Sequence, residues 1–485
     1  MESISISDVI KYTEGELVYG NADAADSVMV YSVSTNSREL EQGALFVPII
    51  GENVDAHRFV DGAFGNGAVA AIASEDVKTD NIPDDVYIIR VDDTLRAVQR
   101  LAAWYRRRYD IPVIGVTGSV GKTTTKEMIA AALSPGRHVL KTIGNRNSQL
   151  GVALMMFELN ADYDIAVIEM GISEPDEMYH LTHMAAPETA VVTNIGVSHI
   201  AMLGSRENIR REKLDIIRGF DGSGTLYVCG DDELLSEIAK FNKTDSMCDI
   251  LTPGAEAVFK TSDVYTYGSG ESCDYRAEDI MPSDGGISFT YKGRRVNLRA
   301  DGVHNAGNAV AALALAGQYG IDTDSAVREL EAYRPLSMRG QVMVHNGITI
   351  IDDTYNASPD SMRSAMGVLW SKQCNGRRYA VLADALELGD MSEKLHREVG
   401  QYIAEEYKNG NITDCLVTVG DMAGRLADEV RDNLPGDSGM YVVSYGNRDE
   451  AAAYLNDNLR DGDMVMLKGS RGMKLDGIVK RLLDR

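Results

Sequence analysis

The chain has 485 residues, of which 44% are hydrophobic, 25% are charged and only 11 are proline. This composition is typical of a folded globular protein and excludes intrinsic disorder, collagen and coiled coil. At roughly 150 residues per domain, the length predicts about three domains. With 73 acidic and 48 basic residues, the formal net charge is −25, which disfavours nucleic acid as a partner. A phosphorylated ligand would therefore depend on a few placed cations, backbone amides and metal ions.

The cysteine pattern and the N-terminal segment favour a cytoplasmic protein. The cysteines are odd in number, widely spaced and without a CxxC pair, which predicts neither disulfides nor a zinc site; they are Cys229, Cys248, Cys273, Cys374 and Cys415. The first residues, MESISISDVIKYTEGEL, lack a basic region and predict a helix from near Ser7 instead of a signal peptide. The longest uncharged stretch, HNAGNAVAALALAGQYG, is interrupted by polar residues, so we expect a buried helix and no membrane insertion.

Along the chain, apolar runs and helical patterns predict an α/β fold in three domains. Residues 1–110 mix short apolar runs with turns and end in a basic helix, LRAVQRLAAWYRRRYD, which indicates a smaller N-terminal α/β domain. Residues 111–334 alternate β-branched runs with helices, which predicts a doubly wound, mainly parallel sheet. Residues 335–485 repeat this alternation after Arg334-Pro335 and predict a Rossmann-like C-terminal domain.

Two smaller features are expected inside the central domain. The turn-rich residues 250–300, with VFKTSDVYTYG and ISFTYKGRRVNL, predict a small antiparallel extension. Helices are expected over about 305–319 and 323–332, directly before the boundary. No repeat period of 20 to 50 residues is visible in the sequence, which disfavours a solenoid.

A phosphate-binding loop is the strongest local signal. In VIGVTGSVGKTTT an apolar strand runs into a glycine-rich turn and then into a helix that starts at Lys122. Glycines allow backbone amides to point at a phosphate, Lys122 supplies positive charge and the Thr123 hydroxyl is a Mg²⁺ ligand type. The spacing departs from GxxxxGK[ST], because Val116 stands where the first glycine is expected. The plain alternative is a glycine-rich turn with a surface lysine.

Two further polar residues follow predicted strands of the same sheet. Glu169 in IAVIEMG is expected at the C-terminal end of a buried strand, and His199, the last residue of AVVTNIGVSH, just past the end of another. Ligands of doubly wound sheets collect outside the carboxyl ends of the strands, so both side chains can converge on the phosphate loop as Mg²⁺ ligands. Alone, each has a plain structural reading: a solvated strand-end carboxylate or a hydrogen-bonded histidine.

The segment SRENIRREKLDIIRGF predicts an inward-facing lysine. At helical spacing Lys213 falls on the apolar stripe of Ile209, Ile216, Ile217 and Phe220, while Arg210, Arg211 and Glu212 are expected to point elsewhere. Burial lowers the pKa of a lysine and makes its neutral amine available as a nucleophile. The alternative is a lysine whose ammonium reaches solvent at the edge of the stripe.

These motifs, in order, resemble the ATP-dependent Mur ligase family of peptidoglycan synthesis. The resemblance is carried by TGSVGKTT, EMG, TNIGVSH, HNAGN and DDTYNASPDSM, and SVSTNSRELEQGALFVPIIGENVDAHRF, ADALELGDMSEKLH and KGSRGMKLDGIV extend it over nearly the whole chain. It implies an enzyme that uses ATP to join D-alanyl-D-alanine to UDP-N-acetylmuramoyl-tripeptide through an acyl phosphate. It also implies two Mg²⁺ ions, and we expect a monomer.

The resemblance also implies roles for individual residues. The ATP-binding residues would be Gly118, Ser119, Val120, Gly121, Lys122, Thr123, Thr124, Asn305, Asn308, Arg339 and Asp353, with the two asparagines at the adenine, Asp353 at the ribose and Arg339 at the phosphates. The metal ligands would be Thr123, Glu169, His199 and Lys213, the last as a carbamate formed with CO₂. The catalytic residues would be Lys122, Lys213, His199 and Glu169. Ser37, Arg38 and Asn147 would bind the UDP-linked substrate.

The sequence departs from the family pattern at several positions. Asn36 stands where Asp is usual, Ala56 where Gly is usual and Ser148 where Asn is usual, and Ala383-Asp384-Ala385 replaces Gly-Asp-Met. The nearest alternative is the ligase that adds lysine or diaminopimelate as the third residue, but its Asp-Asn-Pro-Arg-like sequence is absent from this chain. A folylpolyglutamate synthetase would lack the uridine-nucleotide-like N-terminal domain. From a different class, the alternatives are a nucleotide-binding switch and an inactive scaffold. Lys122, Glu169, His199 and Lys213 together disfavour the inactive scaffold, and steady phosphate release without peptide substrates would favour a switch or a simple ATPase.

Overall fold

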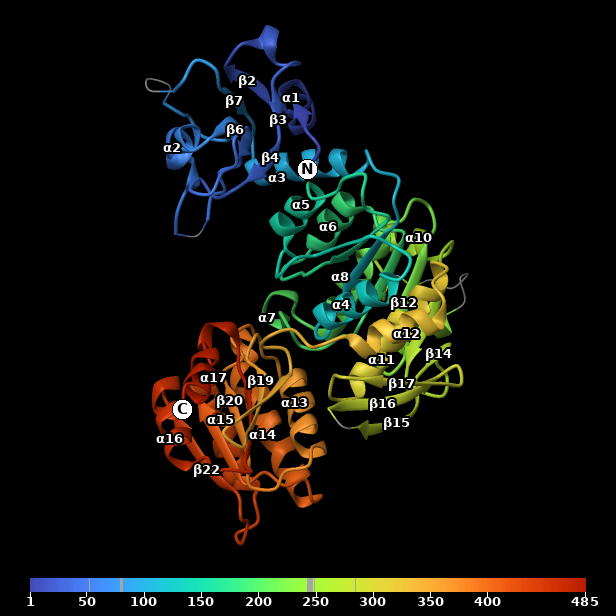
Figure 1. The fold of residues 1–485 in the computed structure, drawn as a ribbon, viewed down its shortest axis with the longest axis vertical. Helices are drawn as coiled ribbons and strands as arrows, with labels where there is room; N and C mark the ends of the chain where they lie inside the picture. The colour runs from blue at the N-terminus through green and yellow to red at the C-terminus, as the bar shows by residue number, and fades with distance from the viewer. Residues whose placement is uncertain (52, 79–81, 242–246, 248, 284) are drawn as a thin grey trace.

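A computed structural model describes residues 1–51, 53–78, 82–241, 247, 249–283 and 285–485. Figure 1 shows three regions that follow one another along the long axis, from the N-terminal region in blue to the C-terminal region in orange and red. Each of the three large sheets lies inside one of the three ranges expected from the sequence. The α/β architecture is therefore confirmed, while the boundaries at 110 and 334 stay predictions.

The N-terminal region is built on a five-stranded sheet in the order β2-β7-β6-β5-β4, in which only β2 runs antiparallel to its neighbour. Helix α1 begins at Ile6, because Ser5 and Asp8 form a capping box. The elements are β1 (Ile4–Ser5), α1 (Ile6–Thr13), β2 (Glu16–Tyr19), β3 (Met29–Val30), β4 (Ser32–Ser34), β5 (Ala44–Phe46), α2 (Val60–Gly65), β6 (Ala68–Ala73), β7 (Tyr87–Arg90) and α3 (Thr94–Arg106).

The central region holds a seven-stranded, wholly parallel sheet in the order β14-β13-β12-β11-β8-β10-β9. Its strands are β8 (Val113–Thr117), β9 (Val139–Lys141), β10 (Ile165–Glu169), β11 (Thr189–Val192), β12 (Thr225–Cys229), β13 (Asp263–Gly268) and β14 (Tyr275–Arg276). Its helices are α4 (Lys122–Leu133), α5 (Gln149–Met156), α6 (Glu177–Ala185), α7 (Ile200–Leu203), α8 (Arg206–Leu214), α9 (Glu233–Ser236), α10 (Pro253–Phe259), α11 (Val303–Gln318) and α12 (Thr323–Ala332).

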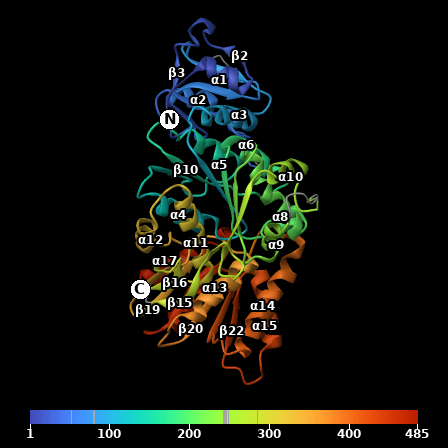
Figure 2. The same ribbon diagram turned by 90° about the vertical axis from the view of Figure 1, so that its right-hand side faces the viewer.

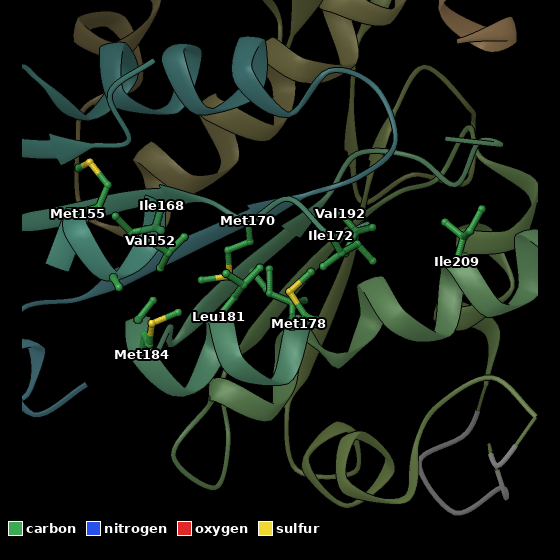
Figure 3. Packing of buried hydrophobic residues seen from close by; sticks show 14 of the residues in the cluster. Val152, Met155, Ile168, Met170, Ile172, Met178, Leu181, Met184, Val192 and Ile209 are labelled. Atoms are coloured by element: carbon green, nitrogen blue, oxygen red, sulfur yellow. The ribbon is translucent and has the colours of Figure 1, made fainter. Parts of the chain in front are cut away.

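Helices cover both faces of this sheet, as the near-continuous apolar strands require. Helices α4, α11 and α12 share one buried cluster, and α5, α6 and α8 share the other. Figure 3 shows the second face, where Met178, Leu181 and Met184 of α6 meet Val152 of α5 and Met170 after β10. This packing fixes the strand ends that carry the polar residues of interest.

The antiparallel extension is smaller than the sequence predicted. Strands β15 (Glu278–Ser283), β16 (Gly286–Tyr291) and β17 (Arg294–Leu298) form an antiparallel sheet, as expected. The run VFKTSDVYTYG was assigned wrongly, because its strand β13 pairs in parallel with β12 and widens the main sheet. Short polar-rich strands give the same local pattern in both settings, so the partner strand decides the direction.

The C-terminal region has a six-stranded sheet in the order β18-β19-β23-β20-β21-β22, antiparallel only between β18 and β19. Figure 2 shows α14 and α15 side by side. The elements are β18 (Gln341–His345), β19 (Ile348–Asp353), α13 (Pro359–Ser371), β20 (Arg378–Ala383), α14 (Ser392–Lys408), β21 (Cys415–Val419), α15 (Asp421–Asn433), β22 (Tyr441–Tyr445), α16 (Arg448–Asn458), β23 (Met464–Lys468) and α17 (Asp476–Leu483).

Two sequence expectations concern features of the whole chain. Cys229, Cys273, Cys374 and Cys415 are free thiols, and Cys248 lies outside the described residues. Within the described ranges, no helix is long and apolar enough to cross a membrane.

Candidate functional site

The glycine-rich loop between β8 and α4 has the backbone geometry of a phosphate cradle. Gly118 has φ +147°, and a Cβ there would lie 1.8 Å from Thr193 Oγ1. Gly121 caps α4 with φ +86°. The loop is held from β11's end, since the Val120 N–H donates to Asn194 Oδ1 (2.9 Å) and Thr193 Oγ1 donates to the Val120 carbonyl (2.6 Å). Only glycine fits both turns without strain.

Lys122 and Thr123 begin helix α4 and point into this cradle. Lys122 Nζ donates to the carbonyls of Gly118 (2.8 Å) and Ser119 (3.3 Å), so the ammonium folds back over the loop. Burial lowers the pKa of Lys122, and the nearby Glu169 carboxylate opposes that shift. The helix N-terminus adds partial positive charge at the same place.

Glu169 ends β10 and is only 2% exposed. Thr123 Oγ1 donates to its Oε2 (2.9 Å), and Asn147 Nδ2 donates to its Oε1 (2.7 Å). Lys126 Nζ lies 3.9 Å from the same carboxylate and donates to the Thr142 carbonyl (2.7 Å). The structure thus joins Thr123, Glu169 and Asn147 through hydrogen bonds and places the buried Lys126 beside them. The sequence analysis did not single out Lys126, and the roles of the other three residues stay predictions.

His199 lies seven residues beyond β11, at the N-cap of α7, with a left-handed φ of +62°. Burial and the charges of Lys213 and Lys122 lower the pKa of His199 to about 4, so the imidazole is neutral near pH 7. Its Nδ1 lies 3.4 Å from Oε2 of Glu387, a residue of the C-terminal region. His199 and the residues of the phosphate loop line the same cavity, and the role of His199 as a metal ligand stays a prediction.

Lys213 is 1% exposed, as its place on the apolar stripe predicted. Burial, and then the charge of Lys122, hold the pKa of Lys213 well below its usual value. Among the described residues, no hydrogen bond or ion pair involves the side-chain nitrogen of Lys213, and the Glu212 carboxylate partly opposes the lowering of its pKa. The expectation that Arg210 and Glu212 point away from the core was wrong: Arg210 pairs with Glu237 (2.8 Å), and Glu212 accepts from the Met178 N–H (3.1 Å).

The α-helix also ends earlier than the stripe suggested. Helix α8 stops at Leu214, and Ile216 and Ile217 belong to the following 3₁₀-helix, Asp215–Gly219. All the stripe's apolar residues are nevertheless buried.

A cavity of about 400 Å³ joins the central and C-terminal regions at the carboxyl ends of the strands. Its lining contains the following predicted residues: Ser119, Val120, Gly121, Lys122, Thr123, Thr124, Asn147, Glu169, His199, Asn305, Asn308, Arg339 and Asp353. Gly118 and Lys213 are not among the lining residues; Gly118 shapes the loop and Lys213 lies behind it.

At the end of the cavity that Asn305, Asn308, Arg339 and Asp353 line, side chains are held in place by their own neighbours. Asn308 Nδ2 donates to Asn305 Oδ1 (3.0 Å) on helix α11. The Arg339 guanidinium lies 3.8 Å from the centre of the Tyr355 ring. Asp353 forms an ion pair with Lys468 (2.6 Å), a residue that the sequence analysis did not single out. Lys468 ends β23 beside β19, a pairing between strands more than a hundred residues apart.

Ser37 and Arg38 lie elsewhere, in the turn after β4 of the N-terminal region. The Ser37 carbonyl accepts from Asn66 Nδ2 (2.8 Å), and the Arg38 N–H donates to Asn36 Oδ1 (3.2 Å). Neither residue lines the cavity. A substrate bound at this turn would have to extend to reach the phosphate loop.

Family models match all three regions of the chain. The Mur ligase middle domain matches residues 116–316, the Mur ligase glutamate ligase domain matches 338–471, and the Mur ligase family catalytic domain matches 29–106. A UDP-N-acetylmuramoyl-tripeptide–D-alanyl-D-alanine ligase of Bacillus subtilis (strain 168) is 36% identical, over 99% of this chain and 98% of the relative. The chain belongs to the Mur ligase family.

Solved structures of this ligase family agree over the full length. A MurF structure from Acinetobacter baumannii superposes with a TM-score of 0.86 at 28% identity and covers 100% of both chains. The MurF ligase of Thermotoga maritima in complex with ADP has a TM-score of 0.78 at 26% identity, covering 94% of this chain and 97% of that one. The predicted family, fold class and ligase activity are confirmed, and the individual site residues stay predictions.

Proposed function

We propose that the protein uses ATP to join D-alanyl-D-alanine to UDP-N-acetylmuramoyl-tripeptide, which yields the UDP-linked pentapeptide, ADP and phosphate. The full-length similarity to ligases with this name supports the proposal. The observation that carries it is the shared cavity, in which Lys122 of the phosphate loop meets the charges of Arg339 and Glu387 from the C-terminal region. Chemistry there is enclosed by two regions, as a water-sensitive intermediate requires.

The reaction has two steps. The terminal carboxylate of the tripeptide attacks the γ-phosphorus of ATP, so that an acyl phosphate forms and ADP leaves. The amine of D-alanyl-D-alanine then attacks the acyl carbon, phosphate leaves and the amine loses a proton. Because the first step brings two anions together, Lys122 and Arg339 are expected to offset their charge. Asn305 and Asn308 are proposed to hold the adenine, Asp353 the ribose, and Ser37 and Arg38 the UDP part.

The residues at the phosphate loop fit Mg²⁺. No group of three or more His, Cys, Asp or Glu side chains that could hold a metal occurs among the described residues, so ATP oxygens would have to complete the coordination. The Thr123 hydroxyl and the Glu169 carboxylate are hard oxygen ligands 2.9 Å apart. With the neutral His199 they are proposed to hold the two ions, which would offset phosphate charge.

Lys213 is proposed to carry a carbamate. Its neutral amine would add to the carbon of CO₂ and lose a proton, which turns a buried neutral amine into a carbamate anion. The support is its burial beside two basic side chains, Lys122 and His199. The resulting carboxylate is also a ligand type suited to Mg²⁺.

The proposed function is tested by phosphate release with ATP and each substrate added in turn. Release should require both the UDP-linked tripeptide and D-alanyl-D-alanine, since the acyl phosphate forms on the first and reacts with the second. Turnover with a UDP-linked dipeptide and free lysine or diaminopimelate would instead identify the protein as the ligase that adds the third residue of the peptide. Steady release without any peptide substrate would indicate a simple ATPase.

A further inference from the structure

A continuous chain of hydrogen bonds runs from helix α3 to the wall of the cavity. Arg96 Nη1 and Gln99 Nε2 both donate to Gln149 Oε1, at 3.3 and 2.9 Å. Gln149 Nε2 then donates to Glu177 Oε1 (2.9 Å). Glu177 Oε2 accepts from the backbone N–H of Ser173 (2.6 Å). The chain therefore links three helices and ends on the backbone of a loop.

That loop, residues 171–176, forms part of the cavity wall. Ser173 and Glu177 line the cavity, and the Glu177 carboxylate partly opposes the lowering of the His199 pKa by burial and by the charges of Lys213 and Lys122. The loop follows Glu169 of β10 and leads into α6, whose N-cap, Asp176, is left-handed and makes no side-chain capping bond. Because Glu177 also accepts from the Glu174 N–H (3.0 Å), one carboxylate fixes two successive amides of the loop.

The other end of the chain lies in the N-terminal region. Helix α3 packs against α5 and α6, and Figures 1 and 2 both show it between the N-terminal sheet and the central region. A shift of α3 would thus act on Gln149 directly. Glutamine can link the two helices because its side chain has both an acceptor and a donor. The Gln149 oxygen accepts from α3, and its amide nitrogen donates to Glu177 at the start of α6.

This part of the cavity is built by other elements than the proposed nucleotide end. Asn147, Ser148, Gly171 and Ser173 line it, and Asn147 donates to Glu169 (2.7 Å), whereas the proposed adenine and ribose residues belong to α11 and to the end of β19. A carboxylate that attacks the γ-phosphate has to approach from the side opposite the nucleotide. The loop held by Glu177 is therefore placed against the peptide arm of the acyl substrate.

We propose that Arg96 and Gln149 are positioning residues that act through Glu177 to hold the cavity wall facing the peptide arm, and that they tie this wall to the N-terminal region. This inference rests on the proposed function. It makes a specific kinetic prediction. Breaking the hydrogen-bond chain should weaken binding of the UDP-linked substrate and leave ATP binding nearly unchanged.

The central experiment is Gln149→Glu, which removes the donor to Glu177 and sets two carboxylates against each other. The KM for UDP-N-acetylmuramoyl-tripeptide should rise about tenfold or more, the size expected for losing a hydrogen bond to a charged group. The KM for ATP should stay within about twofold, because the nucleotide end shares no member of the chain. Arg96→Gln should shift the same constant in the same direction.

Exchanging the two side chains provides the rescue. In Gln149→Glu with Glu177→Gln, the new glutamate can accept from Arg96 and Gln99 and from the amide of the new glutamine, whose oxygen accepts from the Ser173 N–H. The double variant has the same net charge as the wild type, and its KM for UDP-N-acetylmuramoyl-tripeptide should return most of the way to the wild-type value. Arg100→Gln is the matched control, because Arg100 lies on the same helix but binds Thr13 and Glu14 inside the N-terminal region.

Three outcomes would overturn the inference. They are an unchanged tripeptide KM in Gln149→Glu, a parallel rise of both KM values with a lower Tm, or no recovery in the exchange variant. Wild-type protein that releases no phosphate with all three substrates would instead refute the proposed function itself.

Discussion

At the scale of single residues, the site depends on charges that are buried close together. Lys122, His199 and Lys213 interact electrostatically, and burial lowers the pKa of all three. Such crowding of like charges is costly unless an anion is present. A site with this arrangement is prepared for phosphate, and it predicts large effects of substitution on activity and small effects on folding.

Lys122→Ala should leave the fold intact and reduce ligase turnover by about 10²- to 10³-fold, as for loss of one preorganised donor to a developing charge. The ammonium contacts only loop carbonyls in the described structure, so little packing is lost. Phosphate release measures the activity, and circular dichroism checks the fold. Near-normal turnover in a folded variant would contradict the assignment of the phosphate loop.

Lys213 should gain the mass of one CO₂ in native mass spectrometry with bicarbonate present. Lys213→Ala should lose most activity, and acetate should restore part of it by supplying a carboxylate in the vacated space. Lys213→Arg should not help, since arginine stays protonated and cannot add CO₂. A folded, active enzyme with an unmodified amine at position 213 would exclude the carbamate.

At the scale of elements, the phosphate loop is fixed by β11 as much as by its own glycines. Asn194 accepts hydrogen bonds from the N–H groups of Ser119 (3.0 Å) and Val120 (2.9 Å), and Thr193 Oγ1 donates to the Val120 carbonyl (2.6 Å). A side chain at Gly118 would have to displace Thr193, because its Cβ would lie 1.8 Å from Thr193 Oγ1 in a left-handed backbone.

Gly118→Ala should therefore weaken ATP binding by at least about tenfold, which corresponds to about 1.4 kcal/mol, because the strain and the clash act on the same loop. Isothermal titration with ATP measures the effect. Gly317→Ala is the matched control: it lies in α11, a Cβ there meets no atom within 4 Å, and helix propensity favours alanine. Equal ATP affinity in the two variants would show that the loop tolerates a side chain.

At the scale of the whole molecule, the C-terminal region is docked on the central region through few polar contacts. Lys372 pairs with Asp301 (2.8 Å), with side chains only 16% and 12% exposed. Asp360 Oδ2 accepts from the Val197 N–H (3.1 Å). An interface of this kind permits opening and closing, because each contact can be exchanged for water.

Lys372→Met should favour an opened arrangement, since it leaves Asp301 partly buried without its cation. Small-angle scattering of the nucleotide-free protein should show a larger radius of gyration than in the wild type. Lys394→Met is the control, because the Lys394 side chain is 70% exposed and its partner Glu398 lies on the same helix. An unchanged radius in Lys372→Met would mean that other contacts hold the two regions together.

Much of the fold and part of the site could be predicted because the signals are local. The strand, glycine turn and helix around Lys122 follow one another within about a dozen residues. Backbone sterics then determine the conformation of the turn, in which the amides can point at a phosphate. Helical spacing places Lys213 on an apolar stripe, but packing decides whether its ammonium is buried or reaches solvent. The partners of Lys126, Glu387 and Lys468 could not be predicted, because folding brings them together from distant segments or elements.

The sequence by itself predicted the α/β class, the phosphate loop and the place of Lys213 on an apolar stripe, since each depends on spacing within one segment. Tertiary packing decided that Lys213 is buried and does not reach solvent. Tertiary structure decided which sheet β13 joins, because strand pairing depends on partners distant in sequence. It also decided that Arg96 and Gln149 connect α3 to the cavity. A hydrogen bond needs its donor and acceptor within about 3 Å of each other. Packing of helices α3, α5 and α6 brings these segments, which are distant in sequence, to that separation.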